Sequence, residues 1–340
     1  MISMPGANKL FIEKNQTTIN WLLETETPSV RYRTLLYLMK CRDDDQRVME
    51  AKAEIQKSNP VLKLLRQQHS SGAWFADSKY GSSWSEKGTI FSLLLLAELG
   101  AERSESTDRA FDYLHNHVQL QSGLMNYNEV KTQRRYQSPS TSLWCITAVI
   151  LRAALLLGYK DHPLVHRALS FFENFHDNEG GWECSAYSKN PEKVQPPNCY
   201  MGTIKALNAF RLIPPHEQSK KLRAIIKQAV STCLENRVYL YRVDSNGQPA
   251  MKRSWQKFAF PRYWRSDTLE ATNILIQMGV RDKRLSDALD LIQSKQQSDG
   301  RWLLDFSETT RAWIQIEQVG KPSKWITLFG LSTLLDANRV

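Results

Sequence analysis

A leucine-rich segment recurs six times along the 340-residue chain. Each copy opens with a helix-starting residue, continues through an apolar run and ends at a glycine or a polar stop. The copies start near residues 28, 88, 141, 201, 266 and 323, and their regular spacing is typical of repeated supersecondary units. This periodicity favours one array of similar helical units, formed by residues 1–340 as a single domain.

Amphipathic segments lie between the copies. Examples are residues 165–175 and 285–295, in which apolar side chains follow the i, i+3, i+4, i+7 pattern of a helix with one solvated face. The leucine-rich copies are apolar nearly all round, which is typical of helices buried on every side. We therefore predict an all-α fold, an (α/α)6 toroid of six inner and six outer helices.

The two kinds of connection differ in length. The chain passes from an inner to the next outer helix by a short turn, but it returns through loops of about twenty residues or more, which are typical of functional segments. In an up-and-down array these loops share one face, where we expect the function. Four of them begin with a glycine followed at once or soon after by an aromatic or leucine residue, which we interpret mainly as a helix cap. The long loops span residues 69–87, 121–140, 177–199, 237–264 and 298–322.

Charge and composition narrow the partners. The net charge of +10 favours anionic ligands. The five cysteines form no evident disulfide framework, residues 1–14 carry no signal-peptide pattern, and the longest apolar runs are too short to span a bilayer, so we expect a cytoplasmic protein. Neither a nucleic-acid-binding motif nor a dinucleotide fingerprint occurs, and nucleic acid is not an expected partner.

The segment Gln297-Ser-Asp-Gly-Arg-Trp302 and its weaker relatives resemble the Gln/Trp-type repeats of the terpenoid cyclase and protein prenyltransferase superfamily. The likeness covers nearly the whole chain as a repeat pattern and is best from Phe260 to Trp302, a stretch similar to small bacterial proteins with prenyltransferase and squalene oxidase repeats. The resemblance implies an α/α toroid whose aromatic-lined central cavity holds an isoprenoid.

The chain departs from this superfamily at its chemical motifs. It lacks the Asp-x-Asp-Asp acid motif of class II cyclases, and its acidic run at 43–45 is predicted to lie in a short turn. The Asp-x-Cys zinc pattern of prenyltransferase β subunits fails at Cys199, and the Cys-His pair of lanthionine cyclases is missing. A standard member of any of these groups is not expected, and the fold alone does not assign an activity.

Polar residues on the fifth inner helix are the first catalytic candidates. Asp267, Glu270, Asn273 and Gln277 form a stripe on one face of an otherwise apolar segment. Two neighbouring carboxyls raise one pKa, which suits a general acid, so Asp267 and Glu270 are the predicted catalytic residues. The alternative is structural: Asp267 caps its helix, and Glu270 pairs with a neighbour such as Lys205.

Basic and aromatic residues supply a predicted substrate site. Helix N-termini and the basic fourth loop favour a phosphate or diphosphate, while aromatic faces can line an isoprenoid pocket. The alternative is a solvated charged loop with aromatic side chains that pack the loops together. The predicted substrate-binding residues are Trp144, Tyr200, Lys205, Arg262, Trp264, Arg265, Trp302 and Trp325.

Three functional hypotheses follow. The first is a terpenoid cyclase-like or prenyl-processing enzyme that takes an isoprenoid or a similar amphipathic anion, with magnesium or no cofactor and with peripheral membrane contact as an option. The second is a non-catalytic scaffold that binds a peptide, lipid or protein at the long-loop face. The third is a zinc enzyme that uses Cys184 and Cys199, with His176 or Asp177. The oligomeric state stays open.

Overall fold

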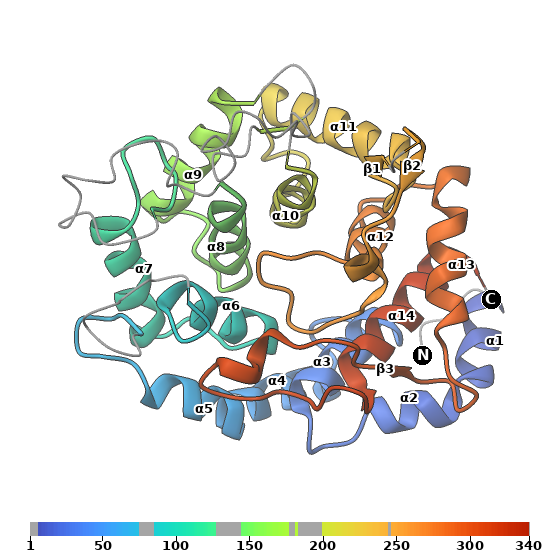
Figure 1. Cartoon of the computed structure of the whole chain (residues 1–340). Coiled ribbons are helices and arrows are strands. Elements are labelled where there is room, and N and C mark those ends of the chain that lie inside the picture. Colours follow the sequence, from blue (N-terminus) through green and yellow to red (C-terminus); the bar gives the residue numbers. More distant parts are fainter. Residues whose placement is uncertain are drawn as a thin grey trace.

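Six buried helices follow one another around a ring in the computed structural model (Figure 1). The model describes residues 6–74, 85–126, 144–176, 181–182, 199–243 and 246–339. Each inner helix begins within a turn of a start predicted from the sequence, and all eleven residues of α6 are buried. The inner helices are α3 (Pro28–Tyr37), α6 (Thr89–Leu99), α8 (Trp144–Leu156), α10 (Tyr200–Phe210), α12 (Thr268–Gln277) and α14 (Lys324–Asp336).

An outer layer of amphipathic helices surrounds this ring, as Figure 1 shows. In α4 the apolar face buries Val48, Ala51 and Ile55, while the charged residues stay at the surface. The prediction of an all-α (α/α)6 toroid is confirmed. The outer helices are α1 (Gly6–Lys14) with α2 (Gln16–Leu22), α4 (Gln46–Lys57) with α5 (Asn59–Arg66), α7 (Glu105–His117), α9 (Pro163–Asn174), α11 (Lys220–Glu235) and α13 (Ser286–Ser294).

The ring closes where the two ends of the chain meet. Lys324, the first residue of α14, pairs with Glu24 at 2.7 Å, and the Thr18 hydroxyl donates to the Asp299 carbonyl. The guanidinium of Arg301 lies 4.2 Å from the ring centre of Trp21. Because these contacts join the first outer helices to the last repeat, the described ends of the chain belong to one closed layer of helices.

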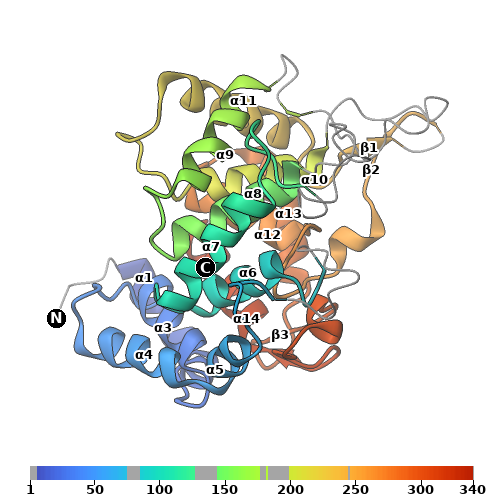
Figure 2. The ribbon, with the colours of Figure 1, turned by 90° about the vertical axis from the view of Figure 1, so that its left-hand side faces the viewer.

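Short strands and 3-10 turns occur only in the loops of the described chain. The antiparallel pair β1 (Arg242–Val243) and β2 (Pro249–Ala250) lies on the side of the ring away from the N-terminus, as Figure 2 shows, and β3 (Trp302–Leu303) pairs with β4 (Pro322–Ser323). The 3-10 turns are η4 (Arg253–Gln256), η5 (Lys283–Leu285) and η6 (Glu308–Arg311). None of the described helices has the length and apolarity needed to cross a membrane.

The glycine-containing loops are helix joints built to one design. In the last repeat, Trp302 donates its backbone N–H to the Thr327 hydroxyl of α14 at 3.0 Å and its indole N–H to the Ile292 carbonyl of α13 at 2.8 Å. Gly300 has a φ of +80°, a left-handed conformation that favours glycine. The Gln296 side chain donates to the Gly300 carbonyl. Each joint thus ties an outer helix to the next inner helix.

The same contacts return in other repeats. Trp74 donates to Thr89 and to Leu64 with nearly the same geometry, and Gly72 again has a positive φ. The backbone N–H of Met125 donates to Thr147. The interpretation of these loops as helix caps is confirmed for the joints that the structure describes.

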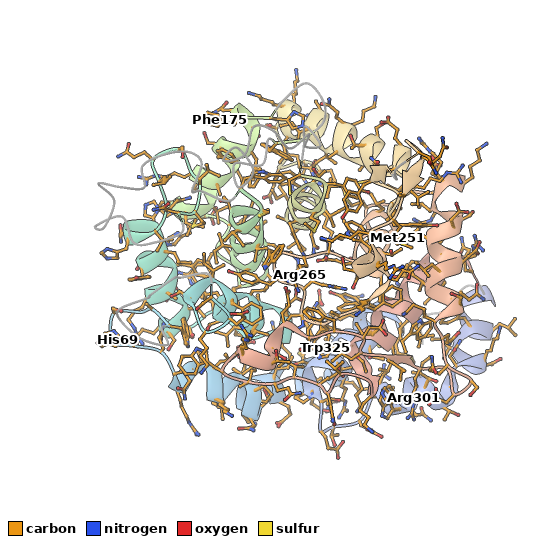
Figure 3. All side chains as sticks on the ribbon, viewed as in Figure 1. His69, Phe175, Met251, Arg265, Arg301 and Trp325 are labelled. Atoms are coloured by element: carbon orange, nitrogen blue, oxygen red, sulfur yellow. The ribbon has the colours of Figure 1, made fainter. Side chains whose placement is uncertain are left out.

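The segment between η4 and α12 crosses the middle of the ring (Figure 1). Arg265, on this segment, lies near the ring centre in Figure 3. A parallel bridge between Ala259 and Phe306 and two hydrogen bonds between Phe258 and Asp305 fasten the segment to the last long loop. We call residues 257–267 the central segment, because they form one end of the space inside the ring.

Replacing Thr327 by valine tests the joint. Valine keeps the shape but leaves the buried N–H of Trp302 without an acceptor, so we expect the free energy of unfolding to fall by about 1–3 kcal/mol. Urea denaturation measures the change, and Thr89→Val should repeat it at the equivalent joint. Thr327→Ser, which keeps the acceptor, is the matched control; equal stability of the two Thr327 variants would show that the hydrogen bond contributes nothing.

Candidate functional site

A cavity lies inside the ring, between the central segment and the C-terminal halves of the inner helices. The centre of a water molecule can occupy about 50 Å³ of it, and its total empty space, which includes open solvent, amounts to about 570 Å³. We call Phe260, Leu269, Ile274 and Phe329 its apolar wall, and Arg33, Tyr37, Glu98, Arg152 and Arg211 its charged wall. The lining side chains belong to Arg33, Tyr37, Glu98, Arg152, Asn208, Arg211, Ala259, Phe260, Arg262, Asp267, Leu269, Glu270, Asn273, Ile274, Gln277 and Phe329.

Two buried arginines share one carboxylate at the centre of the charged wall. Arg152 forms an ion pair with Glu98, and Arg33 lies 3.7 Å from the other oxygen of the same carboxylate. Burial raises the pKa of Glu98, but the two guanidiniums outweigh it and hold that pKa below its usual value. Arg33 also donates to the carbonyls of Ala97 and Glu98 at the end of α6, where helix dipoles favour a cation.

Arg211 faces the same space without a carboxylate of its own. It directly follows α10, and its guanidinium donates to two neutral amide oxygens, those of Asn208 at 2.8 Å and Gln277 at 2.6 Å. Desolvation and the nearby charge of Arg152 lower the pKa of Arg211 to about 10. In the described part of the chain, the charged wall therefore holds three guanidiniums against the single carboxylate of Glu98.

Tyr37 is the hydroxyl group of the charged wall. Arg33 donates to its phenolic oxygen at 3.1 Å. The charge of Arg33 lowers the pKa of Tyr37, and its effect exceeds the opposing effect of burial; Arg211 and Arg152 act in the same direction. Tyr37 is thus a lining group that can donate or accept a proton next to the arginines.

Asp267, the first catalytic candidate, is buried and fully engaged. One carboxylate oxygen accepts the N–H of Glu270 and caps α12. The other accepts the backbone N–H of Ala259 and forms an ion pair with Arg262. Asp267 therefore fastens the central segment to the start of α12, and the helix-cap alternative describes one of its two roles.

Glu270 and Lys205 form a second closed pair. The ammonium of Lys205 lies 2.7 and 2.8 Å from the two oxygens of Glu270, and the Asn208 amide donates to one of them. This is the pairing that the structural alternative predicted. Asp267 and Glu270 both line the cavity, but each is neutralised by a cation of its own.

The predicted aromatic residues do not gather around the cavity. Trp302 and Trp144 pack between helices, with Trp144 against Trp182 at 5.0 Å between ring centres. Tyr200 stacks on Tyr241 and donates to the Val238 carbonyl. Trp325 lies one layer behind the lining, stacked on Phe260 at 3.9 Å.

Two of the predicted residues lie at the surface of the central segment. Trp264 is 36% exposed, and the guanidinium of Arg265 lies over its ring and over that of Phe306. The structure therefore brings together Arg262, Asp267, Glu270 and Lys205, and it leaves the aromatic candidates outside the lining.

The proposed zinc ligands are only partly described. Cys199 is half-buried, whereas Cys184 and Asp177 lie outside the described residues. Within the described ranges, no three His, Cys, Asp or Glu side chains gather as a metal site would require.

The cavity differs from the site predicted on the long-loop face. Tyr37, Glu98, Arg211 and Gln277 lie in the last turns of their helices or directly after them, so the charged wall is near the ends of the inner helices opposite to the N-termini. The sequence carried a signal for it, since Glu98 and Arg152 interrupt otherwise apolar segments. A charged residue in such a segment must face a partner or a cavity.

No protein-family model and no curated protein sequence matches the chain. Solved structures similar to it include a variant of the type II terpene cyclase MstE from Scytonema in complex with geranylgeranyl dihydroxybenzoate, at 15% identity and a TM-score of 0.49, covering 98% of this chain and 99% of that chain. Others are an unsaturated glucuronyl hydrolase specific for heparin (10%, TM-score 0.48, 98% of each chain) and a protein from Actinoplanes (14%, TM-score 0.44, 98% of each chain). The function must be argued from this chain's own cavity.

Two arginine variants test the charge balance. Arg152→Met removes the main partner of the buried Glu98, and we expect it to lower the free energy of unfolding by about 3–5 kcal/mol. Arg211→Met removes a guanidinium that has no carboxylate, so it should leave stability unchanged or raise it by about 1 kcal/mol. Urea denaturation at pH 7 compares them. Equal destabilisation by both changes would mean that Arg211 is a structural partner.

Asp267→Asn tests the fastening of the central segment. The amide can still cap α12, but it leaves the buried Arg262 without a counter-charge, so we expect a loss of about 3–5 kcal/mol. Glu270→Gln changes the more exposed carboxylate of the neighbouring pair and should cost less. Thermal and urea unfolding measure both variants; an Asp267→Asn protein as stable as the wild type would contradict this role.

Proposed function

We propose that the central cavity binds an amphipathic anion, with its charged group at Arg152 and Arg211 and its apolar part against Phe260 and Phe329. The observation that carries the proposal is the charge of the wall: three guanidiniums face one carboxylate, and Arg211 is oriented by amides that leave its charge uncompensated. Keeping such charge at a partly buried site is costly unless an anion completes it.

The apolar wall supports an amphipathic rather than an inorganic ligand. Phe260 and Phe329 line the cavity together with Leu269 and Ile274. Phe260 is held by its stack on Trp325, whose ring plane lies within 10° of its own. These residues add an apolar surface to the same cavity as the arginines, as in sites for small amphipathic ligands.

The small volume of the cavity limits the size of the group that it can hold. About 50 Å³ accommodates a few water molecules or one small charged group. A whole isoprenoid chain does not fit in this volume, so an isoprenoid ligand would place only its charged group at the arginines and part of its chain against Phe260 and Phe329. Tyr37, rather than the paired Asp267, is then the proposed proton donor or acceptor beside the headgroup.

A ligand panel tests this function. It pairs each anion with a neutral analogue, such as farnesyl diphosphate with farnesol, and includes a prenylated dihydroxybenzoate; thermal shift reads binding and mass spectrometry reads conversion. We expect the anions to stabilise the protein and Arg211→Gln to weaken their binding at least about tenfold, the equivalent of 1.4 kcal/mol. Arg223→Gln, on the exposed face of α11, is the matched control.

Two outcomes would contradict the proposal. Neutral alcohols that bind as well as their anions would remove the role of the arginines. Undiminished anion binding by Arg211→Gln would place the site elsewhere on this basic chain.

Phe329→Ala, which shortens a side chain of the apolar wall, should weaken the binding of phenyl phosphate more than the binding of inorganic phosphate.

A further inference from the structure

The charges on the cavity wall define the charge of the ligand. Of the seven ionised groups that line the cavity, Asp267 is matched by Arg262, and Glu270 is matched by Lys205 just behind the lining. Arg33, Arg152 and Arg211 then remain against Glu98 alone, which leaves two positive charges without a counter-charge in the described part of the chain.

Unused donors lie in the same wall. Arg33 and Arg152 are both buried. Their Nε–H groups have no hydrogen-bond partner among the described residues. A buried donor without an acceptor costs about 1–3 kcal/mol. Arg211 differs, since Asn208 and Gln277 fix its orientation through amide oxygens and leave its charge in place.

We propose that this wall is a receptor for a tetrahedral dianion, and that the anion of the proposed function is a phosphate monoester. This inference rests on the proposed function and names its ligand class. A free carboxylate, or the sulfate group of a sulfate monoester, brings one negative charge and would leave one guanidinium without a counter-charge. A phosphate monoester brings a charge of about −1.5 to −2 and three terminal oxygens near neutral pH, and guanidiniums bind phosphate oxygens through paired N–H groups.

The expected dependence on pH comes from the phosphate ester itself. The second proton of a phosphate monoester leaves near a pKa of about 6. The titratable and charged groups that face the site are Arg33 and Tyr37 of α3, Glu98 of α6, Arg152 of α8, Lys205 and Arg211 of α10 and its end, Glu270 of α12, and Arg262 and Asp267 of the central segment. No histidine is among the residues that line the cavity.

Phenyl phosphate and phenyl sulfate make a matched pair of probes, because they have nearly the same shape and differ by one charge. Isothermal titration at pH 8 and constant ionic strength should show phenyl phosphate binding at least about tenfold more tightly. At pH 5.5, where most of the phosphate ester is a monoanion, the preference should largely disappear. Arg211→Gln should reduce the preference at pH 8, and Arg223→Gln should retain it.

The outcomes separate the two proposals. Equal affinity for both probes at pH 8 overturns the dianion receptor and leaves the amphipathic-anion site standing; binding of neither probe overturns both. Flotation with phosphatidylcholine vesicles that contain phosphatidic acid then distinguishes the source of the group. Binding to these vesicles would indicate a lipid headgroup, and binding of phenyl phosphate alone would indicate a soluble phosphate monoester.

Discussion

An inner helix of a closed ring has one direction left for a polar side chain. It packs against an outer helix on one side and against inner neighbours on two others, as α8 does between α6 and α10. Only the axis of the ring remains. Polar residues on the six inner helices must therefore converge at the centre, and Arg33, Glu98 and Arg152 meet there although they come from three different helices. The candidate site follows from this geometry.

The central segment decides how much of that centre stays open. It enters from the long-loop side and is held by Asp267, by Asp305 and by the stack of Phe260 on Trp325. The central segment also bonds to η6: the buried carboxylate of Glu308 accepts the backbone N–H of Tyr263, and burial raises the pKa of Glu308. With this end filled, free space remains toward the C-termini of the inner helices, where dipoles favour cations.

The sequence predicted the fold almost completely, because the fold depends on local patterns. Apolar runs, amphipathic segments and glycine turns repeat in order, and each inner helix begins close to its predicted start. The hydrogen bonds of the joints could not be predicted: Thr89, Thr147 and Thr327 accept backbone N–H groups, and the Gln296 side chain donates to the Gly300 carbonyl. Those partners are fixed by the register between helices, which no single segment reveals.

The site was only half predictable for the same reason. The stripe from Asp267 to Gln277 was visible, since its residues share one helix, and the Lys205–Glu270 pair could be proposed from types alone. Arg33, Tyr37, Glu98, Arg152 and Arg211 come from four helices or their ends, so their meeting depends on tertiary structure. The aromatic candidates could not be placed from the sequence, because a tryptophan between helices and a tryptophan in a pocket have the same sequence signature.

The remaining question is whether Arg211 merely stabilises the end of a helix. A cation near a helix C-terminus gains from the dipole when it bonds to the terminal carbonyls, and Arg33 does this at the end of α6. Arg211 does not: its described bonds go to the side chains of Asn208 and Gln277. Arg211 is held by two neutral amides, and desolvation and the neighbouring Arg152 lower its pKa. Holding this guanidinium in place therefore reduces the stability of the protein without a ligand. Such a cost is typical of a binding site.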